Sequence, residues 1–232
     1  MGAGLRDHSA VSFFLIAFPA LFSIINPLGG SFIFLSATDH YPRPVRAQLA
    51  LWVSIYSFAI VTGSVYIGAY VLEFFGISIP VLRVAGGIVI ALTAWKMLNA
   101  PDDVAPMQER AAESAAVALV ERDTVRRIAF YPLAMPLTTG PGTIAVAISL
   151  GTSRPRDIGH LHYLGFVVEV AVTALCICAL IYLLYRWSDR VSRLLGSTGT
   201  NIIMRLSAFL LFCIGVQVLW SGVSELLAQS GA

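Results

Sequence analysis

The chain has 232 residues, of which 57% are hydrophobic and only 12% are charged, and its formal net charge is +2. A mean hydropathy of +0.80 excludes an ordinary water-soluble globular protein. We therefore expect one membrane domain, 1–232, with the lipid bilayer as its main partner. Neither the net charge nor any basic run indicates a nucleic-acid partner.

Six apolar segments are long enough to cross the bilayer core as helices, which takes ~20 residues each. The first follows Arg6 and could be read as a secretory signal. It is longer than such a signal and lacks a small-x-small cleavage site, so we expect a retained helix. The predicted fold is an all-α membrane protein with six transmembrane helices at 11–36, 47–72, 78–99, 128–150, 161–186 and 202–226.

The longest connection, 100–127, divides these spans into two halves of three helices, 11–99 and 128–232. We interpret it as a solvated linker, with a short surface helix as the alternative. Most arginines outside the spans fall in this connection and in 36–46 and 187–201, which share one side. The positive-inside rule makes that side cytoplasmic and puts both termini outside.

The first and fourth spans contain proline and glycine where a regular helix is expected. The motifs are NPLGG at 26–30 and PLTTGPGT at 136–143. Aligning Pro19 with Pro132 also aligns Gly29 with Gly142. Because each half has an odd number of helices, duplicated halves would be inverted relative to each other. The sequence thus predicts an inverted three-plus-three repeat with broken first and fourth helices.

These breaks are also the predicted solute site. Proline removes a backbone donor and glycine loosens the helix, while unwound backbone cannot face lipid. We expect both breaks to face one polar cavity near the bilayer midplane, where freed backbone groups and polar side chains bind a small solute. The alternative is a pair of proline kinks that serve only packing. The predicted substrate-binding residues are Asn26, Pro27, Gly29, Gly30, Ser31, Thr138, Thr139, Gly140, Gly142 and Thr143.

The ionisable residues within the spans include Arg83, Glu169 and Arg205. A charge in hydrocarbon is costly, so each should face the bundle, a partner or water. Glu169 is the most deeply placed acid. It could form a buried ion pair with Arg83, or it could couple transport to protons. Both arginines could instead extend to the lipid headgroups.

Several kinds of chemistry lack their sequence signatures. The three cysteines form no C-x-x-C motif, and the four histidines are not spaced as metal ligands. There is no P-loop motif and no nucleophile–base set. We therefore expect no enzymatic activity, no metal and no cofactor.

Four motifs carry a family resemblance: NPLGG at 26–30, LSAT at 35–38, RVAGGI at 83–88 and PLTTGPGT at 136–143. Together they resemble the MarC family of bacterial inner-membrane proteins, which is related to neutral amino acid transporters and grouped with LysE-type exporters. The first motif continues into Ser31, Phe32 and Ile33, which departs from the usual family pattern and leaves the preferred substrate open.

The resemblance implies an inner-membrane secondary transporter of small polar solutes such as neutral amino acids. H+ and Na+ are the candidate coupling ions, the direction of transport is open, and a homo-oligomer is compatible with the family. The alternative function is that of a non-transporting membrane protein with an envelope-stress or assembly role.

Overall fold

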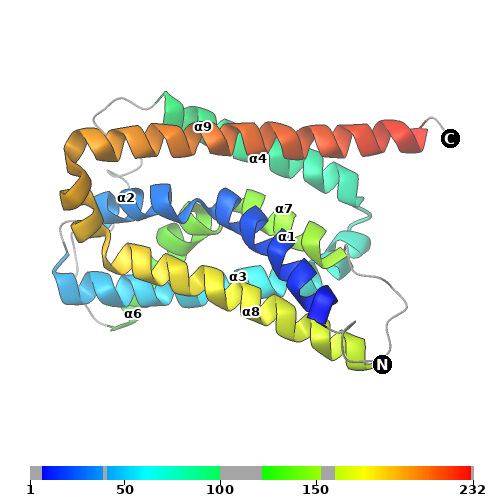
Figure 1. Cartoon of the computed structure of the whole chain (residues 1–232), viewed down its shortest axis with the longest axis horizontal. Helices are drawn as coiled ribbons and strands as arrows, with labels where there is room; N and C mark the ends of the chain where they lie inside the picture. The colour runs from blue at the N-terminus through cyan, green and yellow to red at the C-terminus, as the bar shows by residue number, and fades with distance from the viewer. Residues whose placement is uncertain (1–6, 39–40, 100–121, 153–159, 231–232) are drawn as a thin grey trace.

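The computed structural model describes residues 7–38, 41–99, 122–152 and 160–230. All regular secondary structure in these segments is helical, and the helices are named as in Figure 1. In chain order they are α1 (Asp7–Ile25), α2 (Pro27–Thr38), α3 (Arg43–Phe74), α4 (Ile79–Leu98), α6 (Arg122–Ile128), η1 (Ala129–Thr138), α7 (Pro141–Thr152), α8 (His160–Arg186) and α9 (Ser188–Ser230).

Among the described residues, five helical segments are apolar and long enough to cross a membrane: Phe13–Thr38, Arg43–Phe74, Ile79–Leu98, Gly165–Arg186 and Thr198–Gln229. The fourth predicted span is instead a bent pair, Thr124–Thr138 and Pro141–Thr152, whose two parts meet at 70°. Each predicted span overlaps one of these segments. The prediction of an all-α membrane fold is confirmed.

The bent pair connects the two ends of the bundle, as a sixth span would. Near its start, the Arg126 guanidinium lies 4.5 Å from the centre of the Trp52 ring, in the first part of α3. Near its end, Ser149 accepts a hydrogen bond from Arg83, in the first part of α4. Because α3 and α4 begin at opposite ends of the bundle, the pair passes from one end to the other.

Helices α2 and α8 finish, and α3 and α9 begin, at the same end of the bundle (left in Figure 1). We call this the arginine-rich end. The first turn of α1 and the last turn of α9 both lie at the opposite end. Most of the predicted linker, 100–121, falls outside the described residues. Its final part, 122–127, is helical and belongs to α6.

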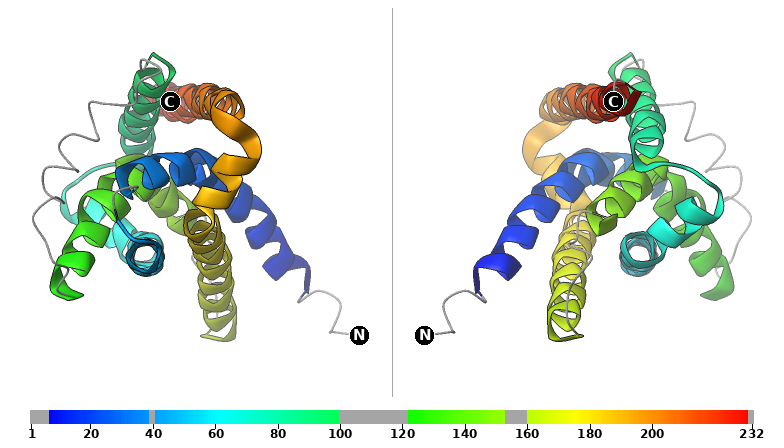
Figure 2. Two further views of the ribbon diagram at one scale, coloured as in Figure 1. Left: turned by 90° about the vertical axis from the view of Figure 1, so that its left-hand side faces the viewer. Right: turned by 90° about the vertical axis from the view of Figure 1, so that its right-hand side faces the viewer.

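Helices α4 and α9 lie side by side along one edge of the bundle (Figures 1 and 2). Glycines allow their backbones to approach closely, as is common between membrane helices. A Cβ added at Gly87 would lie 2.5 Å from the amide nitrogen of Leu219, and one added at Gly215 would lie 2.6 Å from that of Ala91. Side chains on these glycines would therefore force the two helices apart.

The two short helices that follow the breaks pack across the halves. Helix α2 contacts α8 and α9, whereas α7 contacts α3 and α4. Each short helix thus lies against the second and third spans of the other half. In Figure 1, α2 runs towards the arginine-rich end and α7 towards the opposite end. The amino ends of both short helices therefore lie in the middle part of the bundle.

Candidate functional site

The first break consists of a single residue, Asn26, whose φ of +47° lies in the left-handed region. Asparagine adopts this conformation more readily than most residues. The Asn26 amide donates to the Phe22 carbonyl over 2.9 Å, and its own carbonyl accepts from the Gly30 amide over 2.8 Å. Its Oδ1 accepts from the Gly29 amide over 3.2 Å, which caps α2. The break is therefore tighter than predicted, because both glycine amides already have partners.

The second break is larger. Segment η1 is wound more loosely than an α-helix, and Tyr131 and Met135 have extended backbone. Each of them precedes a proline, whose ring disfavours helical backbone in the residue before it. The Thr139 amide donates to the Ala134 carbonyl over 2.8 Å, and α7 starts two residues later. The PLTTGPG motif thus produces a true bend, whereas NPLGG produces a one-residue interruption.

Buried hydroxyl groups tie the second break to α3 and α8. Thr138 Oγ1 donates to the Leu133 carbonyl over 2.8 Å. A threonine hydroxyl has one hydrogen, so Thr138 Oγ1 accepts a hydrogen bond from Tyr185 Oη, which lies 2.9 Å away. Thr139 Oγ1 donates to Ser57 Oγ over 2.7 Å. All of these side chains are buried, and partners inside the protein replace the water they have lost.

Tyr185 brings the two breaks together. Its ring stacks on Phe34, with centroids 4.6 Å apart, and both side chains are almost fully buried. A Cβ added at Gly30 would lie only 2.6 Å from Tyr185 Oη. The tyrosine hydroxyl therefore sits between the α-carbon of Gly30, just after the first break, and Thr138, at the second.

Apolar packing fills the other side of this region. A Cβ added at Gly142 would overlap the side chain of Ile90 on α4. Ile24, two residues before Asn26, belongs to the same buried apolar cluster as Ile90. In this conformation the described residues around the breaks thus face Tyr185 and Ile90, in place of the polar cavity that the sequence predicts.

The remaining predicted binding residues are packed within their own segments. Ser31 is fully buried and donates to the Leu28 carbonyl over 2.7 Å. Pro27 and Thr143 are also buried. A Cβ added at Gly140 would lie 2.9 Å from the Pro136 carbonyl oxygen. Close packing therefore surrounds both breaks.

The charged residues within the spans have contacts that differ from those predicted. Arg83 pairs with Glu225 near the end of α9 and donates from Nε to Ser149 Oγ over 3.0 Å, so it links α4, α7 and α9. The pair between Arg83 and Glu169, one of the two alternatives for Glu169, is not formed in this structure, where the acid of α9 and not that of α8 lies beside the arginine. Glu169 lies half-buried on α8.

Arg205 lies at the arginine-rich end, where its Nη1 is 3.4 Å from the Leu98 carbonyl. Leu98 is the last residue of α4, and a cation there interacts favourably with the helix dipole. Arg83 lies near the start of α4 and contacts the end of α9, whereas Arg205 lies near the start of the apolar part of α9, Thr198–Gln229, and contacts the end of α4. Both contacts join α4 to α9.

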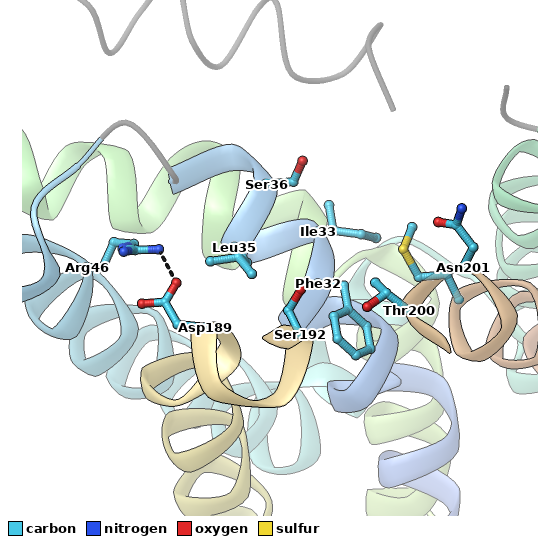
Figure 3. Close-up of a pocket in the computed structure, with 10 residues that line it drawn as sticks. Phe32, Ile33, Leu35, Ser36, Arg46, Asp189, Ser192, Thr200 and Asn201 are labelled. Atoms are coloured by element: carbon cyan, nitrogen blue, oxygen red, sulfur yellow. Dashed lines mark hydrogen bonds and ion pairs between the residues drawn. The ribbon is translucent and has the colours of Figure 1, made fainter. Parts of the chain in front are cut away.

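A cavity of about 440 Å³ lies at the arginine-rich end, between α2, the start of α3 and the first turns of α9 (Figure 3).

Sequence reasoning missed this cavity, and it also missed Tyr185 and Ser57. A tyrosine in the last turn of an apolar helix was the available signal, because a buried phenolic hydroxyl needs a partner.

The chain is similar to curated bacterial proteins over most of its length. It is 35% identical over 209 residues to the inner membrane protein MarC of Citrobacter koseri, with 89% of this chain and 92% of the relative covered. It is 36% identical over 207 residues to that of Salmonella typhimurium and 34% identical over 207 residues to that of Escherichia coli O1:K1, with the same coverage.

No solved structure is significantly similar to the chain. The family model described as MarC family integral membrane protein matches residues 11–227, which include both breaks and most of every long helix. The chain therefore belongs to the MarC family of integral membrane proteins.

Proposed function

We propose that this protein is a secondary transporter of small polar solutes in the bacterial inner membrane, with neutral amino acids as the first class to test. The observation that carries the proposal is the position of Tyr185, whose hydroxyl lies between Gly30 after one helix break and Thr138 at the other. Membrane transporters typically form their solute sites from interrupted helices that meet near the bilayer midplane.

The geometry of the short helices supports the same proposal. Helices α2 and α7 each have 12 residues and begin with proline directly after a break. Their amino ends lie in the middle part of the bundle and carry partial positive charge. The carboxylate of an amino acid is the kind of group that such helix ends favour.

Inverted duplication of the two halves is part of this proposal. The cross-packing of α2 on α8 and α9 matches that of α7 on α3 and α4. The contacts of Arg83 with Glu225 and of Arg205 with Leu98 match in the same way. Two halves related in this way can rock against each other around a central site, which gives alternating access.

Tyr185 fills the space between the two breaks in the observed conformation. Its hydroxyl occupies the space beside Gly30 and satisfies Thr138, so it takes the place that a polar solute would fill. Rotation of the tyrosine away from Gly30 would free this space and leave Thr138 able to accept a hydrogen bond from the solute. On this proposal, Tyr185 closes the solute site in the observed conformation.

A second candidate is a non-transporting membrane protein with an envelope-stress or assembly role. The filled contacts of Gly30 with Tyr185 and of Gly142 with Ile90 favour it, because close packing alone can explain a glycine at each position. On this reading the breaks only shape the bundle.

Uptake by proteoliposomes distinguishes the two functions. Purified protein would be reconstituted and given a panel of labelled neutral amino acids, with and without imposed H+ or Na+ gradients, beside protein-free liposomes. The transport proposal expects uptake of at least one solute above the protein-free background. A folded, reconstituted protein that moves none of the panel under any gradient would favour the second candidate.

Glu169 is the proposed coupling residue if H+ drives transport. We expect Glu169→Gln to abolish gradient-driven uptake while solute exchange persists, because exchange needs no net proton movement. Equal loss of both would assign the residue a structural role. Glu73→Gln, on α3, is a control that removes another acid from a membrane helix.

A further inference from the structure

Three arginines converge on one aspartate at the arginine-rich end. Asp189, in the first turn of α9, accepts a hydrogen bond from Arg46 Nη1 to Oδ1 over 2.7 Å. Arg43 Nε lies 3.8 Å from Asp189 Oδ2. Arg193 Nε donates to the backbone carbonyl of Asp189 over 3.1 Å. Residues from α3 and α9 thus form one charged cluster.

The charges of this cluster do not balance. It contains three guanidinium groups and one carboxylate among the described residues that line the two adjoining hollows. The side chain of Arg46 is only 15% exposed, and its Nε is buried without a hydrogen-bond partner. An arginine has five N–H donors, so one carboxylate oxygen leaves much of its capacity unused. The excess of positive charge favours a second anionic group.

The cavity gives such a group a place to bind. The hollow of about 440 Å³ has Arg46 and Asp189 on its wall, and a smaller hollow of about 200 Å³ adds Arg43 and Arg193. Figure 3 shows the Arg46–Asp189 ion pair beside the cavity, with Ser192 on the same side as Asp189. The larger volume falls within the range of small-molecule sites. The remaining polar lining consists of Ser36, Thr200 and Asn201.

We propose that this cavity binds an oxyanion, a carboxylate or a phosphate group, and that Asp189 occupies part of the site until the ligand displaces it from Arg46. Guanidinium groups bind both kinds of oxyanion with two parallel hydrogen bonds. The ligand is either soluble or the headgroup of an anionic lipid, and the chemistry is the same in both cases. This binding site does not depend on transport by the protein.

The test is a binding titration on the full chain in nanodiscs of phosphatidylcholine. Inorganic phosphate would be added against chloride at matched ionic strength, and the thermal unfolding midpoint would be followed, since a ligand that binds the folded state raises it. A second arm replaces part of the phosphatidylcholine with phosphatidylglycerol. We expect the midpoint to rise in at least one arm, and the arm that responds identifies the soluble or lipid source.

Variants separate this site from general charge effects. Removing the charge in Arg46→Gln should abolish the rise. In Asp189→Asn the resident carboxylate is lost, so the apparent affinity should rise, by roughly fivefold. Should Arg46→Gln fail to fold, Arg43→Gln with Arg193→Gln removes the two exposed arginines instead and should weaken binding. Arg190→Gln, an exposed neighbour outside the cavity lining, is the matched control and should bind as the wild type does.

Two results would overturn the proposed binding site itself. One is a midpoint that responds in neither arm. The other is a response that Arg46→Gln, or the Arg43→Gln and Arg193→Gln pair, leaves unchanged. A weaker affinity in Asp189→Asn would also contradict displacement, because it would make the aspartate part of the ligand contact and not its competitor.

Discussion

The hydroxyl of Tyr185 lies 2.9 Å from that of Thr138 and directly against the α-carbon of Gly30. This contact joins the fifth span to both interrupted helices, which are far apart in the sequence. The tyrosine is almost fully buried and its ring is held against Phe34, so it cannot swing aside without a wider rearrangement.

We expect Gly30→Ala to destabilise the protein by about 1–3 kcal/mol, because its Cβ would press on the tyrosine oxygen. Tyr185→Phe alone should cost about 1 kcal/mol through the lost hydrogen bond. In the double variant the Cβ would meet ring carbons at 3.5 and 3.6 Å, which are ordinary contacts. The double variant should therefore be more stable than Gly30→Ala alone.

Equilibrium unfolding of the four proteins in detergent measures this coupling as a double-mutant cycle. Costs that simply add would mean that Tyr185 does not lie against Gly30. Gly63→Ala, at a glycine of α3 with open space around it, is the control and should leave stability unchanged.

Asn26 combines a left-handed backbone with a cap on α2. Alanine would lose the cap and strain the backbone, at a combined cost of about 2 kcal/mol. Glycine tolerates the positive φ and is an acceptable cap, so Asn26→Gly should cost only about 0.5 kcal/mol. The order of thermal midpoints should be wild type, then glycine, then alanine. An alanine variant as stable as the glycine variant would argue against the observed backbone at this position.

Arg83 should couple energetically to Glu225 and not to Glu169. Removing both partners of the Arg83–Glu225 pair with glutamine should show a coupling energy of roughly 0.5–1 kcal/mol, since both side chains are partly exposed. The costs of Arg83→Gln and Glu169→Gln should add to within ~0.5 kcal/mol. Unfolding of the single and double variants gives both values. Coupling of Arg83 to Glu169 in place of Glu225 would contradict the observed packing of α9 against α4.

Hydropathy alone was enough to predict the fold class and the approximate spans, because crossing a bilayer demands long apolar helices. Proline and glycine also located both interruptions. The size of each break was not predictable, since it depends on whether a side chain such as that of Asn26 can replace the missing helix bonds. That depends on three-dimensional contacts and not on composition.

The partners of the predicted site residues could not be predicted from the sequence either. Which of several acids reaches Arg83 depends on helix order in space, and Glu225 lies far from it along the chain. The Tyr185 contact and the Asp189 cluster likewise join separate helices. Such pairings arise from packing, and a pattern within one helix does not encode them.

Membrane orientation is predicted by the arginines and can be measured directly. Reporter fusions after Ala100 and after Ala232 should report opposite sides, with the first cytoplasmic and the second outside. The reason is that an odd number of spans, three, separates the two fusion points. Identical reports from the two fusions would mean that the bent pair does not cross the membrane or that another span has been misassigned.

The most direct test of the central claim, that the two breaks form one solute site, is uptake by reconstituted Gly142→Leu and Gly63→Leu proteins at equal abundance. Gly142 follows the second break and packs on Ile90, whereas Gly63 carries the same substitution at a position open to the surroundings. We predict that Gly142→Leu inserts but loses uptake, and that Gly63→Leu keeps the wild-type rate. Wild-type uptake by Gly142→Leu would contradict the claim and leave the breaks as packing kinks.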